Sequence, residues 1–148
     1  MFSYQRYIRA LSTLSLALFL VFDAKAETTA FGLTIGSTTE PEMKSKYQVK
    51  QAGINKWSNG KMYKISPNQV GFDGLQELTA IYDKNEMLVV IFANFNKRQF
   101  DYLERILSEK YELSKRHVPR VGNKYAHFRD GNVSIELEAN HMSFKASL

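Results

Sequence analysis

One order of elements, a helix followed by strands, occurs twice along this chain, and this recurrence constrains the fold more than any other feature. Each copy has a Lys-Tyr pair at the end of a predicted helix, a tyrosine within a later strand, and Asn-x-Met at a later hairpin. These features lie at residues 46–47, 63 and 85–87 in the first copy and at 110–111, 125 and 140–142 in the second. The recurrence predicts two tandem units, residues 38–95 and 97–148, each with one helix followed by three strands (αβββ).

The two helices have clear local signals. The segment Thr39-Glu40-Pro41-Glu42 fits a capping box with proline in the first turn, and it predicts a short helix to about Tyr47. Asn96 can cap the second helix, in which apolar residues recur at helical spacing. That stripe consists of Phe100, Leu103, Ile106, Leu107 and Tyr111. It predicts a helix with one face buried against a sheet.

Strands are expected between turn residues over most of the remaining chain. They are placed at residues 31–35, 61–66, 75–82, 87–95, 124–129, 133–138 and 142–148. The stretches 48–57 and 112–118 are expected to be extended as well, and Asn59-Gly60 predicts a hairpin turn after the first of them. Residues 88–92 are continuously apolar, which predicts a central strand covered on both sides. The expected fold is α+β, an antiparallel sheet with two helices on one face.

This order of elements resembles that of the β-lactamase-inhibitor-protein-like fold, found in small exported bacterial proteins that are built from tandem units. The resemblance covers most of residues 31–148 and includes no specific motif. The disulfides of that family have no counterpart, since the chain contains no cysteine. The resemblance implies a sheet whose open face can hold a partner, and an inhibitor-like role by analogy with the fold.

The first 26 residues have the pattern of a secretory signal peptide. Arg6 and Arg9 form a positive segment, residues 10–22 are a 13-residue apolar run, and Ala24-Lys25-Ala26 fits a cleavage site. An apolar run of 13 is shorter than the roughly 20 residues that span a bilayer. The sequence therefore predicts periplasmic or secreted localisation, with residues 27–148 as a single α/β domain that has no transmembrane span after cleavage.

No catalytic or metal-binding motif is recognised, and no cofactor is expected. The three histidines, His117, His127 and His141, are separated by 10 and 14 residues, which matches no metal pattern. Glu136 and Glu138 share one face of a strand, where paired carboxylates occur most often as a solvated surface.

Two long stretches without an acidic residue, 43–72 and 113–129, contain eleven lysines and arginines interleaved with aromatic residues. Such a surface would suit an acidic or anionic partner. The binding residues it predicts are Trp57, Tyr63, Lys115, Arg116, Arg120, Lys124, Tyr125 and Arg129. The alternative is a solvated rim whose counter-charges come from Asp73, Glu77, Asp101 and Glu104.

The charge balance does not indicate a nucleic-acid binder. Removal of Arg6, Arg9, Lys25 and Asp23 with the signal peptide lowers the net charge from +5 to +3. The leading interpretation is an exported binding module for a protein or an anionic envelope component. The alternatives are a small envelope hydrolase that uses His127 or the glutamate pair, and a structural or assembly protein of the envelope. The sequence leaves the oligomeric state and the identity of the partner open.

Overall fold

The computed structural model describes residues 27–143 and 145–148, so the predicted signal peptide lies outside the described residues. After a short hairpin of β1 (Thr29–Ala30) and β2 (Leu33–Thr34), a helix followed by four strands occurs twice. The first unit contains α1 (Glu40–Lys46), β3 (Val49–Ile54), β4 (Asn59–Ile65), β5 (Leu75–Asp83) and β6 (Leu88–Asn96). The second contains α2 (Phe100–Lys110), β7 (Glu112–His117), β8 (Lys124–Asp130), β9 (Val133–Ala139) and β10 (Lys145–Ser147).

The α+β fold and the order of elements expected from the sequence are confirmed, but each unit has four strands where three were predicted. The additional strands are β3 and β7, the extended stretches that directly follow the helices. Tyr63 and Tyr125 both lie in the second strand of their unit, and both Asn-x-Met tripeptides join the third strand to the fourth. The recurrence in the sequence therefore corresponds to a recurrence of topology.

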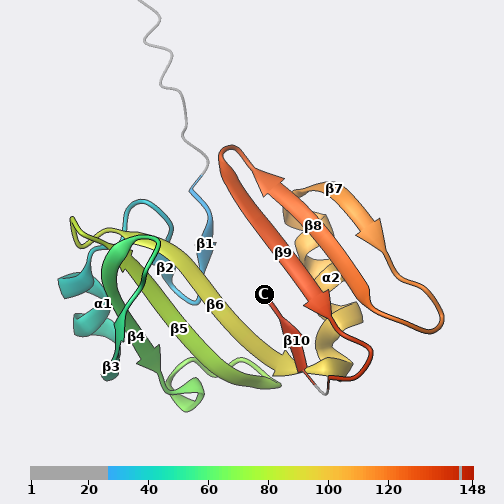
Figure 1. The fold of residues 1–148 in the computed structure, drawn as a ribbon, viewed down its shortest axis with the longest axis horizontal. Helices are drawn as coiled ribbons and strands as arrows, with labels where there is room; N and C mark the ends of the chain where they lie inside the picture. Colours follow the sequence, from blue (N-terminus) through green and yellow to red (C-terminus); the bar gives the residue numbers. More distant parts are fainter. Residues whose placement is uncertain (1–26, 144) are drawn as a thin grey trace, which may run out of the picture.

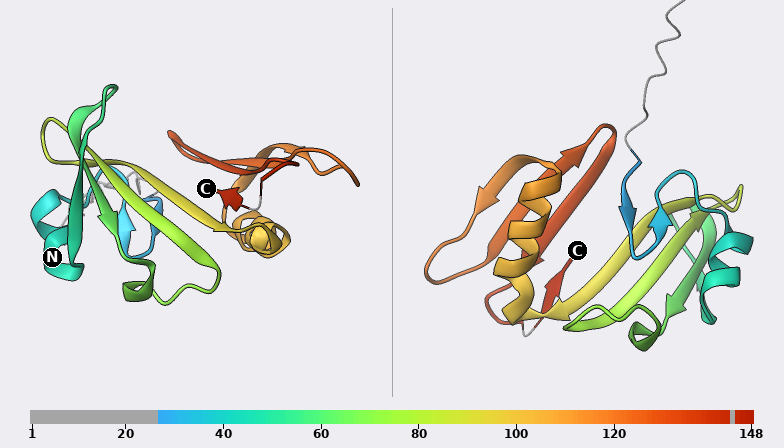
Figure 2. Two further views of the ribbon diagram at one scale, coloured as in Figure 1. Left: turned by 60° about the horizontal axis from the view of Figure 1, so that its bottom comes forward. Right: turned by 180° about the vertical axis from the view of Figure 1, so that it is seen from behind.

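Eight strands form one antiparallel sheet in the order β3-β4-β5-β6-β10-β9-β8-β7 (Figure 1). The second unit is placed in the reverse order of the first, so β6 and β10 meet in the middle and β3 and β7 form the edges. Both helices and the β1–β2 hairpin lie on the same face, as the view from behind shows (Figure 2). Neither α1 nor α2 lies on the opposite face of the sheet, which we call the open face.

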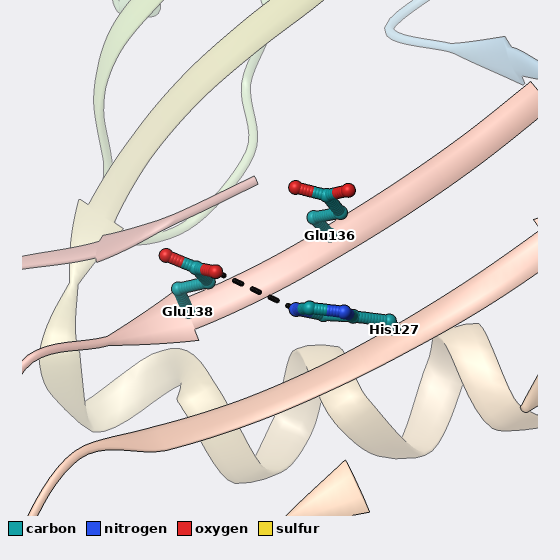
Figure 3. Close-up of side chains that lie close together, drawn as sticks. All are labelled: His127, Glu136 and Glu138. Atoms are coloured by element: carbon teal, nitrogen blue, oxygen red, sulfur yellow. Dashed lines mark ion pairs between the residues drawn. The ribbon is translucent and has the colours of Figure 1, made fainter. Parts of the chain in front are cut away.

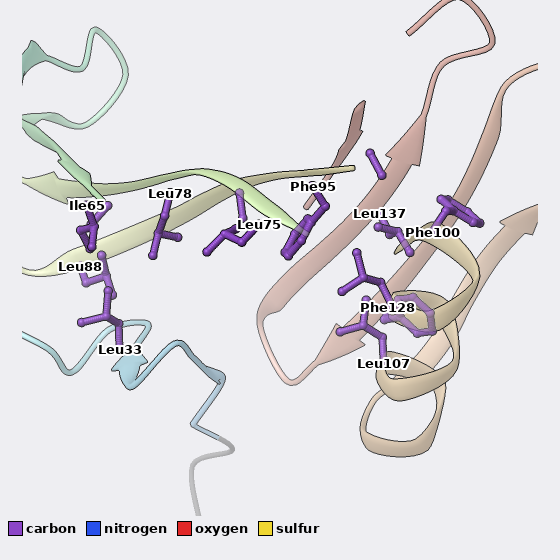
Figure 4. Close-up of a cluster of buried hydrophobic side chains, with 14 of the residues drawn as sticks. Leu33, Ile65, Leu75, Leu78, Leu88, Phe95, Phe100, Leu107, Phe128 and Leu137 are labelled. Carbon is purple, nitrogen blue, oxygen red and sulfur yellow. The ribbon is translucent and has the colours of Figure 1, made fainter. Parts of the chain in front are cut away.

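The hydrophobic core lies between the sheet and its two helices. In the first unit, Leu33, Ile65, Leu78 and Leu88 pack together, whereas the second unit is packed around α2 (Figure 4). Phe100, Leu103 and Leu107 of α2 are at most 8% exposed, which confirms the predicted apolar stripe, with Ile106 partly buried beside it. Figure 4 shows Phe95 between the two groups of side chains.

The local signals for the helix ends and turns are confirmed with two adjustments. The capping box is formed, since Thr39 N donates to Glu42 Oε2 at 2.7 Å and Glu42 N donates to Thr39 Oγ1. Asn96 caps a short 3-10 turn (Lys97–Gln99) that precedes α2. The β3–β4 turn lies at residues 55–58, because the Asn55 side chain accepts hydrogen bonds from the backbone N–H groups of Trp57 and Ser58.

The prediction that residues 88–92 form a strand covered on both sides was wrong in one respect. The strand β6 is central in the sheet, but the side chains of Val90 and Phe92 are 45% and 42% exposed on the open face. The continuous apolar run therefore places some apolar side chains of β6 on a face of the sheet that is partly exposed to solvent. None of the helices within the described residues combines the length and apolar character that crossing a membrane requires.

Candidate functional site

A groove of about 700 Å³ separates the two halves of the sheet. It forms because β10 is only three residues long, while β6 and β9 continue beyond it. Its walls are mainly apolar, with Ile91 and Phe92 of β6 on one side and Ile135 of β9 on the other. Phe31, Leu103 and Ile106 line it on the helix-covered side.

Backbone groups on β6 point into this groove without a partner. Ala93 exchanges two hydrogen bonds of 2.8 Å with Leu148, so its N–H and C=O face β10. Because bonding direction alternates along a strand, the N–H and C=O of Ile91 point to the same side, beyond the end of β10. Within the described residues, no hydrogen bond is formed by the backbone of Ile91 on that side.

The facing edge of β9 is open in the same way. Leu148 bonds towards β6, so the neighbouring Ser147 bonds towards β9, where it is paired with Glu138. The backbone groups of Glu136 and Ser134 then point into the groove by the same alternation. The part of the chain that the structure describes offers them no backbone partner. The groove is thus bounded by two strand edges that face each other.

The N-terminal hairpin borders the groove. Thr28 and Phe31 contribute to its lining, and the Thr28 hydroxyl donates a hydrogen bond of 2.8 Å to Asp130 at the β8–β9 turn. This contact links the N-terminal segment before β1 to the second unit at the end of the groove remote from β10. The groove is therefore held between two connections, Thr28–Asp130 and the β6–β10 pairing.

On the open face beside the groove, His127 of β8 lies next to Glu136 and Glu138 of β9 (Figure 3). One side-chain ligand atom from each residue lies within 4.8 Å of the others. His127 Nε2 is 3.5 Å from Glu138 Oε1, and this nitrogen is buried without a hydrogen-bond partner in the described structure. Sequence reasoning considered the histidine and the glutamate pair separately, and the pairing of β8 with β9 brings them together.

The His127 ring lies against the Tyr125 ring in a tilted arrangement. Its centroid is 5.1 Å from that of Tyr125, which is in turn 5.4 Å from that of His117 on β7. Lys115 Nζ lies 5.2 Å from the Tyr125 ring centroid. Of the predicted binding residues, Lys115 and Tyr125 are therefore close together on the open face.

Other predicted binding residues face the helix side of the sheet or are paired. Arg116 forms an ion pair with Glu104 of α2, and Lys124 Nζ lies 3.6 Å from Asp101. Hydrogen bonding to Glu104 raises the pKa of the Arg116 guanidinium. Asp101 and Glu104, together with Glu77, which pairs with Lys64 and Lys145, supply the counter-charges of the alternative interpretation.

Of the remaining predicted residues, Arg129 also lies on the open face, two residues after His127 on β8, whereas the others do not join it. Tyr63 is 2% exposed and its hydroxyl donates a hydrogen bond to Glu40 of α1, so it faces the helix side, opposite to Tyr125. Trp57 is 93% exposed in the β3–β4 turn, at the opposite edge of the sheet from β7. Arg120 and Arg129 are exposed, in the β7–β8 loop and on β8. Successive side chains of a strand point to opposite faces of the sheet. The repeat in the sequence aligned Tyr63 with Tyr125 but did not show that their side chains lie on opposite faces.

A second polar cluster has a structural role. The Glu40 side chain is 5% exposed and accepts hydrogen bonds from Tyr63, from Lys44 at 2.6 Å and from Lys61 at 3.2 Å. Burial acts to raise the pKa of Glu40, but these hydrogen bonds outweigh it and lower the pKa to about 2. Burial, reinforced by the Glu40 charge, raises the pKa of the neighbouring Tyr82 to about 12. This cluster joins α1 to β4.

Comparisons with protein-family models, with curated proteins and with solved structures give no match for this chain. The functional interpretation accordingly depends on the groove and on the side chains beside it.

Proposed function

We propose that the protein is an exported binding module that holds an extended segment of a partner polypeptide in the groove between β6 and β9. The observation that carries this proposal is the pair of facing strand edges, Ile91 on one side and Ser134 and Glu136 on the other. A segment placed there would continue the line of β10 and complete the middle of the sheet.

The chemistry of the groove favours a polypeptide over another apolar ligand. Open strand edges bind extended peptides by main-chain hydrogen bonds, and pockets beside them select alternate side chains. An acyl chain could occupy the apolar walls, but it would leave the backbone groups of Ile91 and Glu136 without partners. Unpaired buried backbone groups cost free energy, whereas a peptide strand satisfies both edges at once.

The walls also indicate which peptide would fit. Phe92 and Val90 are exposed on the open face, while Leu103 and Ile106 lie on the helix-covered side. An extended peptide directs successive side chains to opposite faces. Apolar side chains would therefore be accepted against Val90 and Phe92 and on the helix-covered side. Glu136 and Glu138 on the β9 wall would disfavour the acidic partner that the basic stretches alone would select.

Export and the binding role are supported by the signal-peptide pattern of residues 1–26 and by the resemblance to β-lactamase-inhibitor-protein-like proteins, which implies a sheet that holds a partner. The envelope hydrolase that the sequence left open would need a pocket around His127. Glu136 and Glu138 line the groove, whereas His127 does not, so the histidine of the hydrolase alternative lies outside it.

Selection from a library of linear peptides on the immobilised protein tests the proposal. We expect enrichment of apolar β-forming sequences, and Phe92→Lys should weaken the selected peptides at least tenfold. Val121→Lys, at a residue 73% exposed in the β7–β8 loop, is the matched control and should bind as the wild type does. Hydrogen exchange gives a direct readout, because the amides of Ile91, Ser134 and Glu136 should become protected only with peptide bound. Peptides that bind equally well to Phe92→Lys and leave these amides unprotected would contradict the proposal.

A further inference from the structure

We propose that His127, Glu136 and Glu138 bind a single zinc ion on the open face. Glu136 and Glu138 also line the peptide groove, but the test of the zinc site does not depend on peptide binding. The proposal depends on the positions of three donor side chains, on one buried nitrogen without a partner, and on the local charge.

The backbone places the three side chains on one face. Glu136 and Glu138 are two residues apart on β9, and His127 is directly opposite Glu136 on β8. The β8–β9 ladder pairs seven consecutive residues on each strand without a bulge. Since bulges redirect side chains and none occurs here, the three donors are held by a regular pair of strands.

The spacing between donor atoms fits a tetrahedral ion. Zinc binds nitrogen and oxygen at about 2.0–2.2 Å, which separates two ligand atoms of a tetrahedron by roughly 3.3–3.6 Å. His127 Nε2 and Glu138 Oε1 are 3.5 Å apart. All three donor atoms lie within 4.8 Å of one another, so a small rotation of the Glu136 side chain would complete the ligand set.

The Nε2 atom of His127 has no other role in the described structure. It is buried, lacks a hydrogen-bond partner and is directed towards Glu138 (Figure 3). A buried polar atom without a partner is uncommon, and an absent ion is one of its ordinary explanations. The contact of the ring with Tyr125 limits its movement, so the nitrogen is already oriented for an ion.

Two carboxylates lie side by side here without a lysine or arginine to balance their charge. Within the described residues, the ion pairs with lysine or arginine are formed by Glu40, Glu77, Asp101 and Glu104, and neither Glu136 nor Glu138 forms one. Two neighbouring carboxylates repel each other, and a divalent cation would remove this repulsion.

The donor set selects the type of ion. An imidazole with two carboxylates suits zinc and related transition metals, whereas calcium and magnesium prefer oxygen ligands in larger number. Three protein ligands would leave the fourth tetrahedral position to water or to a group of a partner.

Isothermal titration of zinc chloride into the full chain, purified without a histidine tag, tests the site. We expect one ion per chain, with affinity lowered at least tenfold in both His127→Gln and Glu138→Gln. The matched controls are His117→Gln, which removes a histidine stacked on the other side of Tyr125, and Glu109→Gln on the exposed face of α2. Both should bind zinc as the wild type does, and magnesium should not compete.

Two further results would support the assignment independently of the affinity. Zinc should shift the His127 imidazole signals in the nuclear magnetic resonance spectrum, and it should raise the melting temperature of the wild type but not that of Glu138→Gln. The proposal would be overturned if zinc failed to bind with saturation, or if His127→Gln bound zinc like the wild type while His117→Gln or His141→Gln did not.

Discussion

Replacement of Glu40 by glutamine tests how α1 is held on the sheet. The carboxylate is buried and accepts hydrogen bonds from Lys44, Lys61 and Tyr63. Glutamine keeps the size of the side chain but removes its charge, so both lysines lose their ionic partner. We therefore expect Glu40→Gln to destabilise the protein at neutral pH without changing the fold.

The magnitude follows from the pKa of Glu40, which is lowered from 4.5 to about 2 in the folded protein. One pKa unit corresponds to about 1.4 kcal/mol, so the shift corresponds to roughly 3 kcal/mol of stability. Because the side chains of Lys44 and Lys61 are 45% and 41% exposed, solvent screening reduces this contribution, and we expect about 2–3 kcal/mol.

The dependence on pH distinguishes the charge from the shape of the side chain. A carboxyl group whose pKa is lowered on folding contributes its full stability above the unfolded value of 4.5 and loses it as the pH falls through about 2. Less than half of the difference between wild type and Glu40→Gln should remain near pH 3.

Urea denaturation at neutral pH, near pH 5 and near pH 3 measures this difference, with Glu109→Gln as a control that should match the wild type throughout. An equal loss of stability for Glu40→Gln at every pH would refute the ionic explanation and indicate a packing defect instead.

Two other predictions concern the second helix and the N-terminus. Leu103→Ala should lower the free energy of unfolding by about 2–5 kcal/mol through lost burial and a residual cavity, because Leu103 is 2% exposed; an unchanged denaturation midpoint would mean that α2 is not docked as described. Mass spectrometry of the exported protein should give a form that starts at Glu27, and recovery of the chain with Met1 from the membrane fraction would argue against cleavage after Ala26.

The fold was largely predictable from local signals. Local signals such as turn residues, the capping box at Thr39 and the stripe around Leu103 each depend on a few neighbouring residues. The structures that they predict are therefore found in the folded chain. The number of strands in each unit was not predicted correctly. The edge strand β7 is exposed along its whole length, so it lacks the alternating pattern of a half-buried strand.

The candidate sites could not be predicted, because they depend on contacts between distant segments. The groove exists because β10 is shorter than its neighbours, and only the pairing register reveals that Ile91 and Glu136 face the same space. The one local sign of the groove was the apolar run at residues 88–92. We interpreted that run as a strand buried on both faces, but its open face is partly exposed. In the same way, His127 and Glu138 are eleven positions apart in the sequence but neighbours across two strands.

The middle of the sheet also has a mechanical consequence. Within the described residues, three β6–β10 residue pairs and the bonds between Ala93 and Leu148 form the backbone ladder that joins the two halves, whereas β5 and β6 are paired over seven positions. The β6–β10 ladder is therefore a shorter connection than the β5–β6 ladder within the first unit. The hydrogen bond from Thr28 to Asp130 crosses the end of the groove remote from β10. One hydrogen bond of this kind contributes only about 1 kcal/mol. Breaking this bond would leave the two halves of the sheet connected mainly through the β6–β10 pairing, with the groove open at its far end.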